Sequence, residues 1–342
     1  MQPSPEPDQL PTPTTPTETP GPTRIRSLTL AGLKQIYSPK TVQQALADLP
    51  VGANEALRST YEKMIRVGGE RFCSKPPGMP DFAVLLDELP NFSQVLDDLR
   101  GQLALCLESD DPLRLTPMLL LGEPGIGKTY FARRIASMLG TGYGFIPMSS
   151  LTAGWVLSGA SSQWRNARTG KVFDTLVHGD HANPVMVIDE IDKVSAESHY
   201  DPLGALYGLL ESDTAKLFTD EFAEVPIDCS EVVWIATANE ASRIPEPLLN
   251  RMNVYEIAAP DAPGARRIGR SLYRELQAGH HWGSQFPAEL DEAALDRLAV
   301  LAPREMRRAL MQAFGSARLD GRTRLCAQDL STRGVRKQRI GF

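Results

Sequence analysis

Two short segments of this chain combine residue types that can bind and cleave phosphates. The segment Gly122-Glu123-Pro124-Gly125-Ile126-Gly127-Lys128-Thr129 fits the pattern G-x-x-x-x-G-K-[ST], and residues 185–190 form an apolar run that ends in two carboxylates. A glycine-rich backbone, a lysine and a hydroxyl are the groups that hold nucleotide phosphates and their magnesium ion. The two segments together predict a Mg²⁺–nucleotide site with its own hydrolytic base, and hence a nucleoside triphosphatase.

The first segment has the context that such a loop needs. It follows the apolar residues 118–121 and opens an amphipathic helix that stops at Gly140. The glycines allow amide groups to surround phosphate oxygens, and the start of the helix adds its positive end. Lys128 is expected to reach the β- and γ-phosphates, and Thr129 is expected to place its hydroxyl on Mg²⁺.

Polar residues also follow two other apolar strands. Asp189 is expected to hold Mg²⁺, through water, and Glu190 to orient and polarise the attacking water. Asn239 ends the run 232–238, which we expect to lie between the first two strands. It is expected to contact the γ-phosphate or the lytic water, although an asparagine after a strand also suits a simple turn.

Two arginines are candidates for stabilising charge on the transferred phosphate. Arg251 comes twelve residues after Asn239, and Arg304 opens the last amphipathic helix. Such a guanidinium is worth about 10³–10⁵ in rate in related enzymes. The alternative for both is a structural ion pair, and Arg307 and Arg308 are the substitutes for Arg304.

Hydrophobic patterning divides the chain into five parts. Residues 1–23 hold eight prolines and six threonines and are expected to be disordered. Residues 24–80 are expected to form a small helical region, 81–259 an α/β nucleotide-binding domain, 260–317 an all-helical lid and 318–342 a basic tail. The α/β domain is expected to contain a parallel sheet covered by helices on both faces. Its strands are expected at residues 118–121, 145–148, 185–188, 232–236 and 254–257.

Bulk properties limit the classes of partner. The net charge of the 342 residues is −6, which argues against general affinity for nucleic acid, despite seven basic and two acidic residues from Arg318 onward. The four cysteines lack metal-ligand spacing, and His178, His181, His280 and His281 are read as solvated, so magnesium is the expected metal. No export signal or membrane-spanning run is evident, and the protein is expected to be cytoplasmic.

These segments, in this order, resemble the AAA+ ATPases, and within them the ATPase module of Lon proteases. Residues 122–129 match Walker A and 189–190 match Walker B, while Asn239, Arg251 and Arg304 match sensor 1, the arginine finger and sensor 2. The similarity to Lon runs from about residue 85 to 315 and is most specific over 183–257. The resemblance implies ATP as the nucleotide and a P-loop domain with a five-stranded sheet, a lid and a helical N-terminal extension.

The resemblance also implies how the chain works. Arg251 is expected to act on the nucleotide of a neighbouring copy. This requires assembly into a ring, which the resemblance implies to be a hexamer. Trp164 and Arg165 correspond to the axial loop that grips polypeptide, although Trp164 packing under its own loop is equally open. Residues 197–200 are the candidate second axial loop, and residues 89–92 with the sensor 2 helix are the candidate adenine site. Only 38 residues follow Arg304, so no serine–lysine protease domain is expected.

Three functions remain open from the sequence. The first is ATP-driven protein remodelling by a Lon-like ring that carries no protease of its own, on an unknown protein substrate or adaptor. The second is a nucleic-acid-associated motor or loader, for which only the basic tail offers a surface. The third is a nucleotide-gated assembly scaffold, which requires a degraded site, whereas every catalytic group is present here.

Overall fold

The molecule is described by a computed structural model over residues 30–330, apart from residues 53, 108, 110–111, 151–154, 165–166 and 195–200. Within these residues the central sheet has five parallel strands in the order β4-β5-β8-β3-β9. Each strand overlaps one that the sequence predicts, and β8 lies between β5 and β3 as expected. The strands are β3 (Met118–Leu121), β4 (Tyr143–Pro147), β5 (Val185–Asp189), β8 (Val233–Ala238) and β9 (Asn253–Glu256).

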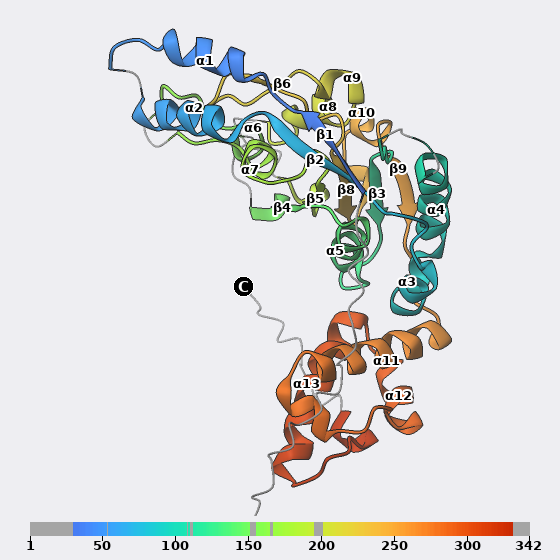
Figure 1. The fold of residues 1–342 in the computed structure, drawn as a ribbon. Helices are drawn as coiled ribbons and strands as arrows, with labels where there is room; N and C mark the ends of the chain where they lie inside the picture. Colours follow the sequence, from blue (N-terminus) through green and yellow to red (C-terminus); the bar gives the residue numbers. More distant parts are fainter. Residues whose placement is uncertain are drawn as a thin grey trace, which may run out of the picture.

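Helices cover both faces of this sheet (Figure 1). Successive side chains of a strand point to opposite faces. Val185 and Val187 therefore enter one apolar core, whereas Met186 and Ile188 enter the other. The first core includes α3 (Phe82–Glu88), α4 (Ser93–Leu107) and α5 (Lys128–Leu139). The second includes α6 (Trp155–Ser158), α7 (Lys171–Val177), α8 (Gly204–Leu209), α9 (Ser212–Ala215) and α10 (Glu246–Leu249).

The N-terminal region contains strands as well as helices, so the expectation of a small helical region over 24–80 needs correction. Helices α1 (Pro39–Ala47) and α2 (Glu55–Val67) are flanked by an antiparallel pair, β1 (Leu30–Gln35) and β2 (Glu70–Lys75). The pattern of β2 conceals a strand because Arg71 is buried and Phe72 is half exposed. The Arg71 guanidinium donates to the carbonyls of Leu176 and Val177, which satisfies its buried charge.

The same region packs on the α/β domain as part of one core. Its buried side chains Ile36, Tyr61 and Met64 belong to the apolar cluster that contains Met186 and Ile188 of the sheet. The Tyr61 hydroxyl also donates to the carbonyl of Ala223 at 2.7 Å.

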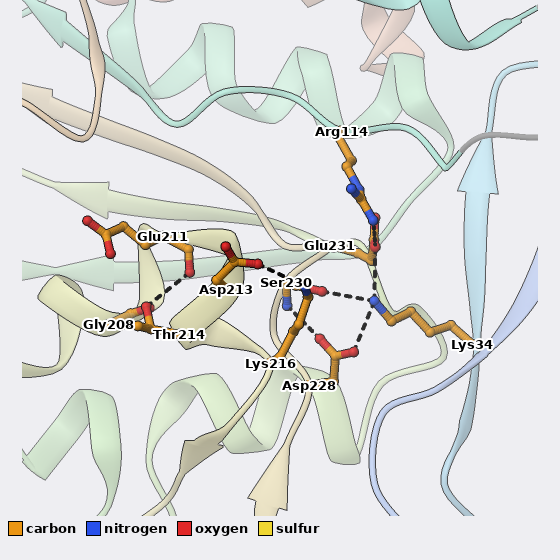
Figure 2. Close-up of polar contacts among 10 residues, drawn as sticks. All are labelled: Lys34, Arg114, Gly208, Glu211, Asp213, Thr214, Lys216, Asp228, Ser230 and Glu231. Carbon is orange, nitrogen blue, oxygen red and sulfur yellow. Dashed lines mark hydrogen bonds and ion pairs between the residues drawn. The ribbon is translucent and has the colours of Figure 1, made fainter.

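Polar contacts join the two parts as well. Lys34 on β1 lies 3.1 Å from Asp228 and 2.9 Å from Glu231, and Arg114 approaches the same Glu231 carboxylate (Figure 2). The N-terminal region is thus joined to the sheet by apolar and charged contacts together.

The lid has a core of its own. Helices α11 (Ala262–Ala278), α12 (Glu292–Leu298) and α13 (Pro303–Leu319) bury an aromatic group around Tyr273 and Phe314, whose rings stack at 5.4 Å. The lid lies to one side of the α/β domain, next to α3 and α5 (Figure 1). A short hairpin, β6 (Phe218–Thr219) with β7 (Pro226–Ile227), precedes β8.

The basic segment from residue 318 begins inside the lid. Helix α13 continues to Leu319, and Leu325 and Leu330 are buried in the lid core. Arg322 pairs with Asp329 at 2.7 Å, so part of the positive charge is neutralised locally. The described part of the expected tail is therefore folded against the lid.

Some predictions fall on residues that the description does not cover. These are the Pro/Thr-rich segment 1–23, Arg165, the second axial loop at 197–200 and residues 331–342. Among the residues that are described, none of the helices has both the length and the apolar character needed to cross a lipid bilayer.

Candidate nucleotide-binding site

The loop between β3 and α5 uses its glycines in different ways. Gly125 and Gly127 have φ values of 84° and 109°, a left-handed region that favours glycine. A Cβ on Gly122 would lie 2.3 Å from the carbonyl oxygen of Ile257, so that position needs close backbone approach. The loop leads directly into α5, whose first amides are free of intrahelical acceptors. This geometry suits an anion at the start of α5.

Lys128, the first residue of α5, is enclosed by oxygen atoms. Its ammonium donates to the carbonyl oxygens of Gly122 and Glu123, and to Oδ1 of Asn239 at 3.0 Å. The residue is only 8% exposed. Burial lowers the pKa of Lys128, and the charges of Asp192, Asp189 and Glu190 oppose that shift. The three oxygens hold the lysine in place beside the end of β8.

Asp189, at the end of β5, accepts two hydroxyl groups on a single oxygen. Thr129 donates to its Oδ1 at 2.7 Å and Thr237 donates to the same atom at 2.9 Å. The Thr237 hydroxyl also accepts the backbone N–H of Glu190 at 2.9 Å. Thr237 thus ties the two carboxylate residues to β8.

Sequence reasoning missed Thr237 because a threonine inside a buried strand is ordinary for a sheet. Its position two residues before Asn239, at the sheet edge where the other polar groups converge, was the available signal.

Glu190 has a backbone conformation that is uncommon for a residue other than glycine. Its φ is 56°, in the left-handed region, and the short 3₁₀ turn Ile191–Lys193 follows. Such a conformation costs of order 1–3 kcal/mol and persists where its surroundings enforce it. Here it brings Glu190 to the same cavity as Asp189.

Within this turn, Asp192 is buried, and both its carboxylate oxygens lack a hydrogen-bond donor among the described residues. The Lys193 ammonium lies 3.4 Å from one of them.

These groups line a cavity of about 400 Å³ between the α/β domain and the lid. The α/β side contributes the glycine-rich loop and the ends of β5 and β8, and the lid contributes side chains of α11 and α13. Arg304 and Arg307 both line the cavity, whereas Arg308 is not among its walls. A Cβ on Gly125 would meet the Cβ of Arg304 at 3.4 Å, so the lid approaches the loop closely here.

The residues 89–92, which were expected to contact the adenine base, line the cavity only in part. Leu89 lines the cavity, whereas Phe92 is fully buried below it and stacks on Phe131 at 4.7 Å. Among the walls that were not anticipated from the sequence are Glu88 and Tyr130 on one side and Ile268, Ser271 and Leu272 of α11 on the other. The Glu88 carboxylate accepts from Arg134, and burial with this neighbouring negative charge raises the pKa of Tyr130 to about 12.

Arg251 lies away from this cavity. It is not among the cavity's walls, and its guanidinium Nε is 2.7 Å from Oε1 of Glu211. The structure therefore brings the Walker A loop, Asp189, Glu190, Asn239 and Arg304 together and leaves Arg251 apart from them.

Trp164 lies in a turn and is 46% exposed. Its backbone N–H donates to the carbonyl of Ser161 at 2.9 Å, and its own carbonyl accepts the N–H of Ala167 at 3.2 Å. The Trp164 side chain therefore lies at the surface of the protein and is about half exposed to solvent.

Comparison with known proteins fits this geometry. Residues 118–258 match the model of the "ATPase family associated with various cellular activities (AAA)". A Lon protease of Clostridium beijerinckii is 33% identical over 181 residues, which cover 53% of this chain and 23% of that protein. The peroxisomal Lon protease homolog 2 of Arabidopsis thaliana is 30% identical over 269 residues, covering 78% of this chain and 28% of the relative. The matched stretch thus spans about a quarter of these relatives.

A solved structure shares the fold. The Saccharomyces cerevisiae Hsp104:casein complex superposes with a TM-score of 0.57 at 17% identity, over 82% of this chain and 52% of that one. The predicted combination of a five-stranded parallel sheet and a C-terminal helical region is confirmed by this likeness and by the strand order. The chain therefore contains an AAA ATPase domain that is related to the ATPase region of Lon proteases.

Proposed function

We propose that this chain hydrolyses ATP with Mg²⁺ and uses the energy to remodel proteins, working as a ring of copies, six by analogy with its family. The observation that carries the proposal is the convergence of Lys128, Asp189, Glu190 and Asn239 on one cavity that Arg304 approaches from the lid. The AAA match and the Lon relatives support ATP hydrolysis.

The residues present fit magnesium and a triphosphate. Carboxylate and hydroxyl oxygens are the protein ligands that Mg²⁺ prefers, and Asp189 Oδ1 lies 2.7 Å from the Thr129 hydroxyl. The left-handed glycines leave room for phosphate oxygens against the loop, and Lys128 brings a positive charge to the same place. When bound, Mg·ATP supplies the γ-phosphoryl group that is transferred to water.

Each side chain then has one task. Glu190 accepts a proton from the attacking water, and Asn239 holds that water or the terminal phosphate. Lys128 and Arg304 stabilise negative charge from opposite walls of the cavity. Arg251 completes the site of a neighbouring copy, which agrees with its position away from its own cavity. A single copy is then catalytically incomplete.

A protein is the favoured substrate. The matched relatives are named proteases, which act on proteins, and the net charge of −6 disfavours a nucleic-acid track. Trp164, which is 46% exposed in a turn, offers an aromatic side chain that could grip a polypeptide. Rocking of the lid against the loop at Gly125 would couple hydrolysis to movement of such a loop.

The proposal is tested by a Glu190→Gln variant and by mixing. The variant should bind ATP with the normal affinity and release phosphate very slowly, and it should retain its protein substrate for identification. Mixing it with Arg251→Ala should restore phosphate release, because the first copy keeps Arg251 and the second keeps Glu190. Normal hydrolysis by Glu190→Gln would refute the assigned base, and mixtures that stay inactive would refute action between copies.

A further inference from the structure

The side chain of Arg251 is held by residues that no sequence motif marks. Arg251 follows α10, and its terminal nitrogen Nη1 donates to the carbonyl oxygen of Pro247 at 2.6 Å. Two further contacts come from a different segment, helix α8 and the residues that follow it. The Tyr207 ring lies under the guanidinium, with 5.9 Å from its centroid to Cζ, and the Glu211 carboxylate lies 2.7 Å from Nε.

The segment that makes these contacts is itself well anchored. Leu206 and Leu209 of α8 are buried in the core under the sheet. The backbone carbonyl of Glu211 accepts the N–H of Ala215 at 2.9 Å and the hydroxyl of Thr214 at 3.2 Å. The position of the Glu211 backbone is therefore fixed by α9, and its side chain extends from a firm base.

The direction of the Glu211 carboxylate is specific. Figure 2 shows it pointing away from the neighbouring Asp213, whose own carboxylate pairs with Lys216 at 2.9 Å. Two acidic residues of one short segment thus have different ion-pair partners. One is 95% exposed at its side chain and pairs locally, and the other reaches across to Arg251.

These contacts leave part of the guanidinium available. The Glu211 carboxylate lies beside Nε as an ion pair without hydrogen-bond geometry, the Pro247 carbonyl accepts from Nη1, and the Tyr207 ring covers one face. Within the part of the chain that the structure describes, the second terminal nitrogen, Nη2, donates no hydrogen bond to the protein. A guanidinium has five N–H donors in a rigid plane, so the hydrogen bond at Nη1, the nearby carboxylate and the ring together set the direction of its remaining edge.

We propose that Glu211, supported by Tyr207, is a positioning residue that aims the guanidinium of Arg251 at the nucleotide of a neighbouring copy. The inference rests on the proposed function, which assigns Arg251 to the neighbour's site. A half-exposed ion pair contributes little to folding stability, so the value of this contact lies in geometry. Small displacements of a catalytic group have large effects on rate.

The test uses Glu211→Gln, with Asp213→Asn as the matched control from the same segment. Glu211→Gln should lower kcat for ATP on the order of 10-fold at protein concentrations that saturate assembly. The KM for ATP should stay unchanged, because Glu211 does not line the cavity. Asp213→Asn should stay within about twofold of the unmodified protein, since it pairs with Lys216 at the surface.

A double variant separates positioning from a purely structural role. In the Arg251→Ala background, Glu211→Gln should cause no further loss, since it acts through an arginine that is gone. Equal losses in both backgrounds would overturn the inference, as would a kcat within twofold of the control. Thermal unfolding checks that each variant is folded, and Glu211→Asp, which keeps the charge on a shorter side chain, should recover part of the lost rate.

The outcomes also distinguish the role of Arg251 at a neighbouring site from the positioning role of Glu211. If Arg251→Ala hydrolyses ATP normally, the assignment of Arg251 fails and this inference fails with it. If Arg251→Ala is impaired while Glu211→Gln is normal, the assignment of Arg251 stands and the positioning role alone is refuted.

Discussion

The nucleotide cavity and the surroundings of Arg251 are built in opposite ways. Lys128 is 8% exposed and held by three oxygen atoms, two of them from the backbone. The Arg251 side chain is 26% exposed and is held by one carbonyl, one carboxylate and one ring. The first arrangement is complete within a chain, whereas the second ends at the surface. Substitutions in the cavity should thus impair the nucleotide site of the copy that carries them. Substitutions around Arg251 should impair only the site of a neighbouring copy.

The largest effect should follow Lys128→Met. The loss of the ammonium removes the positive charge that faces the phosphates, so ATP binding and phosphate release should both fall below detection at micromolar nucleotide. Binding of a fluorescent ATP analogue measures this directly. Lys216→Met, at an exposed lysine, is the control. Normal binding by Lys128→Met would show that the cavity is not where the nucleotide sits.

Arg251→Ala should lower kcat by about 10³-fold while leaving ATP affinity intact. The reason is that Arg251 is not a wall of its own cavity. Comparing the two variants by nucleotide titration and steady-state kinetics sharpens the contrast between the regions. Weakened ATP binding with an unchanged kcat would place Arg251 at the nucleotide of its own copy. The contrast between the cavity and the surroundings of Arg251 would then be wrong.

Thr237→Val should have an intermediate effect within the cavity. The substitution keeps the shape and removes the hydroxyl that joins Asp189 to the Glu190 amide. Groups that orient a metal ligand are typically worth about 10–100-fold in metal affinity or activity. The Mg²⁺ concentration for half-maximal hydrolysis should rise, whereas the exposed Thr219→Val should leave it unchanged. An unaltered Mg²⁺ requirement in Thr237→Val would contradict this role.

Trp164→Ala should change ATP hydrolysis least, within about twofold, because Trp164 is not a wall of the cavity. Unfolding of a model protein substrate, followed by loss of its fluorescence, should stop. An intact unfolding activity would favour the alternative in which Trp164 only packs against its own loop.

Contiguous motifs made much of the nucleotide-binding domain predictable. The strand Met118–Leu121 agrees with the predicted range 118–121 at both ends, since an apolar run meets a glycine-rich stop signal there. Side chains that act through tertiary contacts were not predictable. Thr237 looks like any strand residue, and Glu211 meets Arg251 only because α8 and α10 pack together.

The strands of the N-terminal region show a second limit. A strand is read from alternating burial, and β2 inverts the usual alternation because Arg71 finds carbonyl acceptors on α7. Tertiary hydrogen bonds of this kind leave no trace in local periodicity.

The core that the N-terminal region shares with the sheet determines where this chain can be truncated. A shorter version that starts at residue 81, where composition suggests a boundary, would lose Ile36, Tyr61 and Met64 from a cluster they form with β5. The apolar side chains of this cluster that pack against those residues would then face water, which favours aggregation over a stably folded domain. Expression work on the ATPase should therefore begin upstream of Leu30, and a nucleotide-free precipitate from a shorter version would say nothing about catalysis.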